Sequence, residues 1–272
     1  MKRLLITAMI CAAATGVFAQ KMTDSTKNLA AINNNNKIKT GFGNDGFEFD
    51  VYKKDDTVTH HGNTYPKGFM GITFSRFDLG YAVLTDNGNF NLSPKNQFLD
   101  YNQWKTSNVG FDVFQMGVKL NKNFKMYLSA GFDWTLIRLR NNITIVPGAP
   151  VLTWKPDSVH LHKDRLSASY LRVPLSFDFH SDKNDKGDRF NFVFGPEAGL
   201  LMNGMLKQVS VADGKQKFDA GFNFTKIRYG TFMRVGYGGW GVFAKYYFND
   251  MFENSPDQAG VKSFAFGLTF GF

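Results

Sequence analysis

Eight segments of the chain alternate between large apolar residues and small or polar residues at every second position. A period of two is the period of a β-strand, in which successive side chains point to opposite faces. The clearest example is SFAFGLTFGF, in which Phe264, Phe266, Leu268, Phe270 and Phe272 share one face. The alternation predicts an all-β chain. It leaves open whether the Phe-rich faces contact a protein core or lipid.

The connections between these segments indicate how the strands are arranged. The short link at 121–123 and the Gly238-Gly239 dipeptide alternate with long links near 80–107, 139–164, 203–225 and 250–260. A Gly-Gly pair suits a two-residue hairpin turn. The pattern predicts an antiparallel up-and-down transmembrane β-barrel of about eight strands, with short periplasmic turns and long extracellular loops. The predicted strands are Gly68–Leu79, Asn108–Leu120, Phe124–Arg138, Arg165–Phe179, Arg189–Met202, Lys226–Tyr237, Trp240–Asn249 and Val261–Phe272.

The length of the apolar faces favours lipid over a protein core. Phe124 and Trp134 lie on one strand face, and the distance between them is about 25 Å along a membrane normal at ~3.3 Å per residue and a tilt of roughly 40°. We therefore predict that they belong to opposite interfacial girdles. Tyr237 and Trp240, which flank the Gly-Gly turn, are predicted to belong to the periplasmic girdle. A soluble barrel or sandwich is the alternative, but it would expose faces that are unusually rich in Gly and Ala.

The N-terminal part of the chain differs from the rest. Residues 1–19 have the charged, apolar and small-residue regions of a secretory signal peptide, and the one cysteine of the chain, Cys11, lies within them. Residues 20–64 are rich in Asn, Lys, Asp and Thr and predict a flexible periplasmic leader, whereas residues 65–272 form the predicted barrel. We expect an integral outer-membrane protein whose leader and C-terminus are periplasmic. After the signal, no apolar run is long enough for a transmembrane helix.

The faces opposite the apolar ones carry charged residues. An eight-stranded barrel is just wide enough for side chains to fill its interior, so the lumen is expected to be blocked. A hairpin centred midway in the turn 181–188 places His180 opposite Arg189 and predicts a direct ion pair between Arg172 and Glu197. Pro174 and Pro196 predict bulges in the same strands. The residues predicted to form an interior ion-pair network of structural role are Arg172, Glu197, Asp178, Asp133, Arg228, Arg234 and Lys245.

Four segments carry a family resemblance. They are SASYLRVPLSFDF (167–179), FVFGPEAGLLMNG (192–204), IRYGTFMRVGYGGWGVFAKYYFNDMF (227–252) and the final FAFGLTFGF. Residues 66–272 resemble the PorT-like outer-membrane β-barrel family of Gram-negative bacteria. The resemblance implies a fold and a location but no catalytic residues, and one branch of that family is associated with protein secretion. The terminal aromatics Phe264, Phe266, Phe270 and Phe272 also resemble the assembly signal that the barrel-insertion machinery reads.

One loop contains residue types that catalysis and metal binding use. In DSVHLHKD these are Asp157, Ser158, His160, His162 and Asp164. No recognised motif connects them, so we predict no catalytic, metal or cofactor site. A lipid-modifying enzyme or protease with a site at the barrel rim is kept as an alternative.

The expected function is therefore that of a non-enzymatic outer-membrane barrel, structural or active in surface interactions. The expected partners are outer-membrane lipids, including lipopolysaccharide, the barrel-insertion machinery and an unidentified secretion or surface partner. A narrow channel or an accessory to protein secretion is the first alternative. The net charge of +9 is basic, but export and the lack of a Lys/Arg-dense helix argue against nucleic acid as a partner.

Overall fold

The computed structural model describes residues 36–43, 46–53, 65–73 and 76–271. The expected signal peptide, most of the expected leader and Phe272 lie outside these residues. Within the leader, β1 (Asn36–Gly43) and β2 (Gly46–Lys53) are strands. In the part of the chain that the structure describes, no helix is long and apolar enough to cross a membrane.

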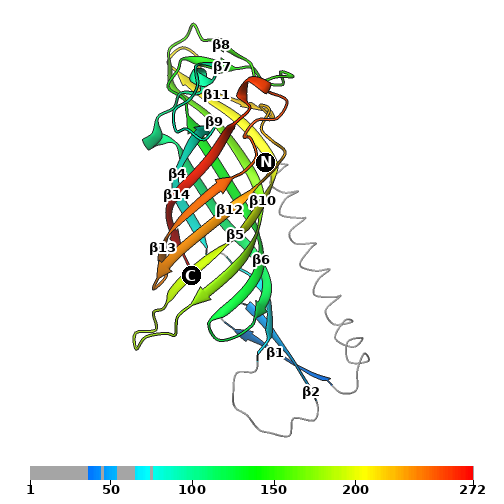
Figure 1. The fold of residues 1–272 in the computed structure, drawn as a ribbon. Helices are drawn as coiled ribbons and strands as arrows, with labels where there is room; N and C mark the ends of the chain where they lie inside the picture. Colours follow the sequence, from blue (N-terminus) through cyan, green and yellow to red (C-terminus); the bar gives the residue numbers. More distant parts are fainter. Residues whose placement is uncertain (1–35, 44–45, 54–64, 74–75, 272) are drawn as a thin grey trace. The chain divides into compact units, whose positions relative to one another are not determined.

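Eight antiparallel strands close into a barrel (Figure 1). Consecutive barrel strands are neighbours in space, and β14 pairs with β4 to complete the ring. This confirms the predicted all-β, up-and-down antiparallel barrel. In chain order the barrel strands are β4 (Phe77–Asp86), β5 (Ser107–Lys119), β6 (Phe124–Arg138), β9 (Leu161–His180), β10 (Phe190–Ser210), β12 (Ile227–Tyr237), β13 (Trp240–Tyr247) and β14 (Val261–Phe270).

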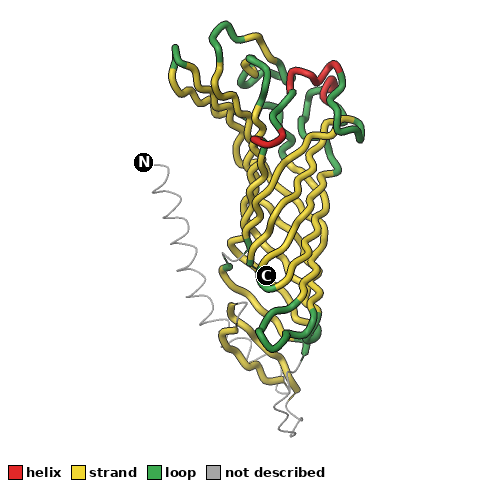
Figure 2. The backbone as a smooth tube through the Cα atoms, turned by 90° about the vertical axis from the view of Figure 1, so that its left-hand side faces the viewer, coloured by secondary structure: helices red, strands yellow, loops and turns green. Residues whose placement is uncertain are grey.

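The connections alternate in length as predicted. Figure 2 shows the long loops gathered at one end of the barrel and the short turns at the other. Gly238 and Gly239 have φ of 57° and 92°, the positive values that a two-residue primed turn requires. The long loops contain η1 (Pro94–Leu99), η2 (Gln103–Lys105), β7 (Ile143–Ile145), β8 (Trp154–Pro156), β11 (Gly214–Asp219) and η3 (Pro256–Gln258).

The first predicted strand, Gly68–Leu79, is wrong in its bounds. The structure has two strands there, β3 (Lys67–Ile72) and β4, which pair with different parts of β5. At the level of the break, β5 has a bulge between Asp112 and Phe114. Phe69 and Asp78 are both buried, although one number is odd and the other even. The alternate positions that point inward therefore change from odd to even numbers across the break.

The hairpin of β9 and β10 extends beyond its predicted bounds and has a different register. The predicted register places His180 opposite Arg189, whereas the structure places it opposite Asn191. The turn that precedes Asn191 contains Gly187 with φ of 85°. Asn184 Oδ1 accepts hydrogen bonds from the backbone N–H groups of Lys186 at 3.0 Å and Asp188 at 2.8 Å. This compact turn accounts for the two-residue displacement.

The bulges expected at the two prolines are not formed. Glu197 lies opposite Pro174, and Phe194 lies opposite Phe177, so the register is the same on both sides of Pro196. The two register shifts of this pair occur instead between Leu201 and Asn203 and between Val209 and Ser210. The β9–β10 pair therefore stays regular where it carries Arg172 and Glu197.

The outer face of the barrel is apolar on every strand. Burial alternates along each strand; in β6 it does so almost without interruption. The predicted outward faces are confirmed by this alternation, and the inward residues are the buried ones. We call the exposed residues on the outer face the apolar wall: Leu79, Tyr81, Met116, Met126, Leu128, Phe179, Phe194, Leu200, Tyr229, Met233, Val242, Phe266 and Leu268.

Candidate functional site

A network of charged side chains fills the middle of the barrel interior. We call it the charged layer. Each barrel strand from β4 to β13 supplies at least one member, and β14 supplies Thr269, whose Oγ1 donates to Asp78 Oδ1 at 2.8 Å. Its anionic and cationic members balance one another in number. The members, all buried, are Asp78, Asp112, Asp133, Glu197, Arg172, Arg228, Arg234 and Lys245.

Asp78 is the main acceptor of the charged layer. Arg234 binds it with a fork, donating Nε to Oδ1 at 3.1 Å and Nη2 to Oδ2 at 2.8 Å. Arg172 Nη1 reaches Oδ2 at 2.8 Å, and Lys245 Nζ reaches the same oxygen at 2.9 Å. Charge-assisted hydrogen bonds of this kind are stronger than neutral ones, and burial strengthens them further. One carboxylate thus joins β4 to three strands that are distant in sequence.

Asp133 is the second acceptor. Lys245 Nζ lies 3.0 Å from its Oδ1, so this ammonium bridges the two carboxylates. Its Oδ2 accepts from Asn108 Nδ2 at 3.0 Å and from Arg228 Nη2. The Arg228 guanidinium lies between two rings, 3.8 Å from the centroid of Tyr170 and 4.1 Å from that of Tyr247. Stacking of this kind stabilises a buried guanidinium.

The predicted direct ion pair between Arg172 and Glu197 is wrong. Gly199 lies opposite Arg172, and the Arg172 Nε donates to Asp112 Oδ1 at 3.0 Å. Glu197 Oε1 instead accepts from the Tyr247 hydroxyl at 2.7 Å. The two-residue displacement of the hairpin separates the pair but keeps both side chains inside, because side chains alternate with a period of two.

Inward glycines make room for the long cations. A Cβ on Gly110 would lie 2.7 Å from Arg172 Nη1, and one on Gly199 would lie 3.0 Å from Arg228 Nε. Both distances are shorter than normal contacts. The inward glycines of the sequence therefore leave the space that the guanidinium groups occupy.

The structure buries all seven residues predicted for the interior network. Asp178 stands apart from the charged layer, with its Oδ2 3.5 Å from Lys125 Nζ. The sequence interpretation missed Asp78 and Asp112. Asp112 lies at an inward position of its predicted strand, so the same alternation that identified Asp133 as inward could have identified Asp112. Asp78 was hidden by the break before β4.

The long loops enclose a hydrophobic core over one end of the barrel, which we call the cap core. The Tyr101 hydroxyl accepts from Leu84 N at 2.9 Å and fixes the loop after β4 to the end of that strand. Apolar packing therefore closes the end of the barrel that the charged layer does not fill. The residues of the cap core are Leu84, Phe98, Leu99, Tyr101, Ile137, Leu139, Ile143, Ile145, Leu152, Leu166, Ala168, Tyr170, Leu206, Phe222, Phe224, Phe252 and Val261.

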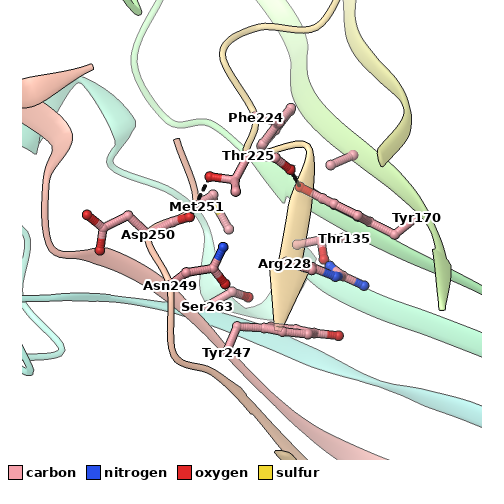
Figure 3. Close-up of a pocket in the computed structure, with 11 residues that line it drawn as sticks. Thr135, Tyr170, Phe224, Thr225, Arg228, Tyr247, Asn249, Asp250, Met251 and Ser263 are labelled. Atoms are coloured by element: carbon pink, nitrogen blue, oxygen red, sulfur yellow. Dashed lines mark hydrogen bonds between the residues drawn. The ribbon is translucent and has the colours of Figure 1, made fainter. Parts of the chain in front are cut away.

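A small pocket lies where the charged layer meets the cap core (Figure 3). Arg228, Tyr170 and Tyr247 line it, and its volume is about 20 Å³. Tyr170 donates to the Thr225 carbonyl at 2.9 Å, and Thr225 Oγ1 donates to the Asp250 carbonyl at 2.6 Å. A pocket of this size holds about one water molecule. It has no room for an organic substrate.

The predicted girdle and assembly-signal residues lie on the outer surface where the structure describes them. Phe124 stacks on Phe179 with ring centroids 4.4 Å apart, and Trp240 meets Phe270 at 4.9 Å. The remaining members with described positions are Trp134, Tyr237, Phe264 and Phe266, which are half-buried or exposed.

The candidate residues at the rim, in the loop before β9 and at the start of β9, do not converge. His160 and His162 are exposed, with ring centroids 5.4 Å apart. Asp157 accepts from Thr144 Oγ1 at 2.7 Å and from Val159 N at 3.0 Å, and these hydrogen bonds hold its pKa below the ordinary value. Asp164 is buried on the inward face. The described residues contain no group of three His, Cys, Asp or Glu side chains placed to hold a metal ion.

Asp164 makes the stability of the loop end depend on pH. Burial raises its pKa from 3.8 to about 7, although Gln208 and Arg138 oppose part of the effect. The unfolded chain releases this proton near pH 4 and the folded chain near pH 7, so the free energy of unfolding is expected to fall as pH rises between these values. An effective dielectric constant well above that of dry protein limits the change to the order of 1–2 kcal/mol. Urea unfolding at pH 5 and pH 8 measures it.

Asp164→Asn is expected to remove this pH dependence. Asp185→Asn, which changes an exposed carboxylate in the opposite turn, is the matched control and should leave it unchanged. An equal pH dependence in wild type and Asp164→Asn would show that other groups cause it.

No protein-family model matches this chain, and no curated protein matches it. An eight-stranded antiparallel barrel with an apolar outer face and a charged interior is the architecture of outer-membrane barrel proteins.

Proposed function

We propose that the protein is an integral outer-membrane β-barrel with a side-chain-filled lumen, and that it acts as a structural or surface-interaction protein rather than an enzyme. The observation that supports this best is the inverted distribution of side chains. The apolar wall runs over all barrel strands while the charged layer is buried. A soluble barrel directs its apolar faces inward. Lipid around the barrel makes the inverted arrangement favourable.

The orientation follows the usual arrangement of such barrels. Short turns belong to the periplasm and long loops to the cell exterior, so the leader and the C-terminus are assigned to the periplasm. Membership of the PorT-like family is part of the proposal and is supported by the segments quoted from 167 onward together with the barrel itself. Fractionation tests the location: the protein should sediment with outer membranes and migrate differently on gels before and after heating. Recovery as a soluble periplasmic protein would contradict it.

The interior charges and the cap core predict that the barrel does not conduct. Arg172, Arg234 and Lys245 converge on Asp78 at the middle of the lumen, and side chains fill a barrel of this strand number. Refolded protein in a planar bilayer is expected to give no stepwise currents. A heat-unfolded sample, which should also give none, is the control. Reproducible steps from folded protein alone would favour the second candidate, a narrow channel or secretion accessory, which the polarity of the lumen supports.

The barrel-insertion machinery is a proposed partner. The outward aromatics of β14, with Phe272 after them, carry the proposed signal. Deletion of Phe272 is expected to reduce insertion in cells by more than the roughly 2 kcal/mol that a Phe side chain contributes when it is removed from water. Spontaneous refolding in detergent should stay largely intact. Deletion of Phe90, an exposed loop residue, serves as control. Equal insertion of the two variants would remove this partner from the proposal.

A further inference from the structure

A row of like charges lies on the outer surface at the loop end of the apolar wall. Arg138 on β6 is directly opposite Arg165 on β9, and Arg165 is directly opposite Lys207 on β10. Lys207 is in turn opposite Lys217 on β11. We call these four residues the basic row. At about 4.8 Å between neighbouring strands, the row extends over roughly 14 Å.

Two further cations reinforce the basic row. Lys163 and Lys215 both lie opposite Val209, which is two residues beyond Lys207 along β10 and farther from the apolar wall. All six side chains are half-buried or exposed, and no ion pair among the described residues joins any of them to a carboxylate. Like charges on directly opposed residues repel. Repulsion from Lys215, which lies diagonally across the β10–β11 pair, also lowers the pKa of Lys207.

A groove lies beside the basic row on the side of the apolar wall. It has a volume of about 370 Å³ and is lined by Trp134 on one side and Met205 on the other, with Arg165 at its end. Ser167 and Ser169 of β9 line it between them. Their hydroxyls donate to the carbonyls of Met205 at 3.0 Å and Asn203 at 3.1 Å. Because these hydroxyls are already bonded, the groove presents a surface that accepts an apolar chain.

We propose that the groove and the basic row together bind a phosphorylated lipid of the outer leaflet. The acyl chain lies against Trp134 and Met205, and the phosphate oxygens accept hydrogen bonds from the basic row. The length of the row matches a lipid with more than one phosphate, and arginine forks suit phosphate geometry. Bound phosphates also offset the repulsion among the cations. This inference rests on the proposed membrane location, which brings the groove to the depth of the acyl chains.

Binding of diphosphorylated lipid A to the refolded full chain in nonionic detergent tests the site. Native mass spectrometry is expected to detect saturable binding that weakens at least about tenfold in Arg165→Gln/Lys207→Gln, because each charge-assisted hydrogen bond contributes about a factor of ten or more. The matched control, Lys183→Gln/Lys186→Gln, removes the same charge from exposed residues of the opposite turn and should bind as wild type. If the Arg165 variant does not refold, Lys207→Gln/Lys217→Gln gives the same comparison.

Two further arms separate lipid from free phosphate. Ser169→Trp, which fills the groove, and removal of the lipid phosphates are each expected to weaken binding about tenfold or more, and inorganic pyrophosphate should compete poorly. Equal binding by both charge variants, or full displacement by pyrophosphate, would overturn the lipid site. A wild-type chain with heat-modifiable migration that binds no lipid A contradicts the site alone. A chain that never forms such a barrel contradicts the proposed function.

Discussion

Replacing Asp78 by alanine is expected to lower the free energy of unfolding by about 3–5 kcal/mol. This carboxylate accepts from Arg172, Arg234 and Lys245 and is fully buried. Its removal leaves three buried cations without their shared counter-charge, and Asp133 contacts only part of the set. The loss is larger than that for a surface ion pair because water does not reach the groups that remain.

Urea-induced unfolding in lipid vesicles, followed by tryptophan fluorescence, measures this loss. Asp182→Ala is the control because it breaks the exposed ion pair with Lys122, for which a much smaller loss is expected. The double variant Asp78→Ala/Arg234→Ala should lose less than the sum of its single changes, since the two residues contact each other. Equal effects of Asp78→Ala and Asp182→Ala would contradict the central role of Asp78.

A charge placed on the apolar wall is expected to have the second large effect. Leu128 lies on the outer face of β6 between Phe124 and Trp134, and it is 42% exposed in the protein alone. In a bilayer, Leu128→Arg should cost about 2–4 kcal/mol, because the guanidinium must enter hydrocarbon. On a soluble protein, the same change at an exposed position usually stays within about 0.5 kcal/mol.

The control is the same type of substitution at a position outside the apolar wall. Val211 lies in the β10–β11 loop and is 85% exposed, so Val211→Arg should change the free energy of unfolding by less than about 0.5 kcal/mol. Both variants are unfolded with urea from the same vesicles. A small effect at Leu128 equal to that at Val211 would mean that water, not lipid, surrounds the wall.

Outside Gly68–Leu79, the alternation in the sequence was sufficient to predict the barrel strands and their two faces because both are local properties of a strand. Met126, Tyr127, Leu128 and Ser129 alternate between outer and inner faces as their positions require. The register of β9 against β10 depends instead on the turn around Asn184, where side-chain hydrogen bonds set the length. The assumption of a symmetrical hairpin did not account for this turn. It therefore predicted the wrong residue opposite Arg172.

The charged layer was predictable in its members but not in its pairs. Asp78 meets Arg234 over a separation of 156 residues and Thr269 over 191. Such contacts depend on the stagger of all strands around the ring, which no local pattern encodes. The cap core was missed for a related reason: Phe98 in η1 and Ile145 in β7 belong to the long loops, and their burial depends on contacts that form only when the loops fold over the barrel.

The central claim is that lipid surrounds the barrel, and spin labels placed one by one along β6 test it most directly. Cys11→Ser provides a cysteine-free chain, to which single cysteines are added at Met126, Leu128 and Ala130 and, as inward controls, at Tyr127 and Ser129. In outer-membrane vesicles we expect oxygen to relax the outward labels strongly and a water-soluble nickel complex to relax them weakly. At the inward positions we expect the nickel complex to relax the labels more strongly than oxygen does, or both to relax them equally. Outward labels that the nickel complex relaxes more strongly than oxygen does would contradict a membrane-embedded barrel.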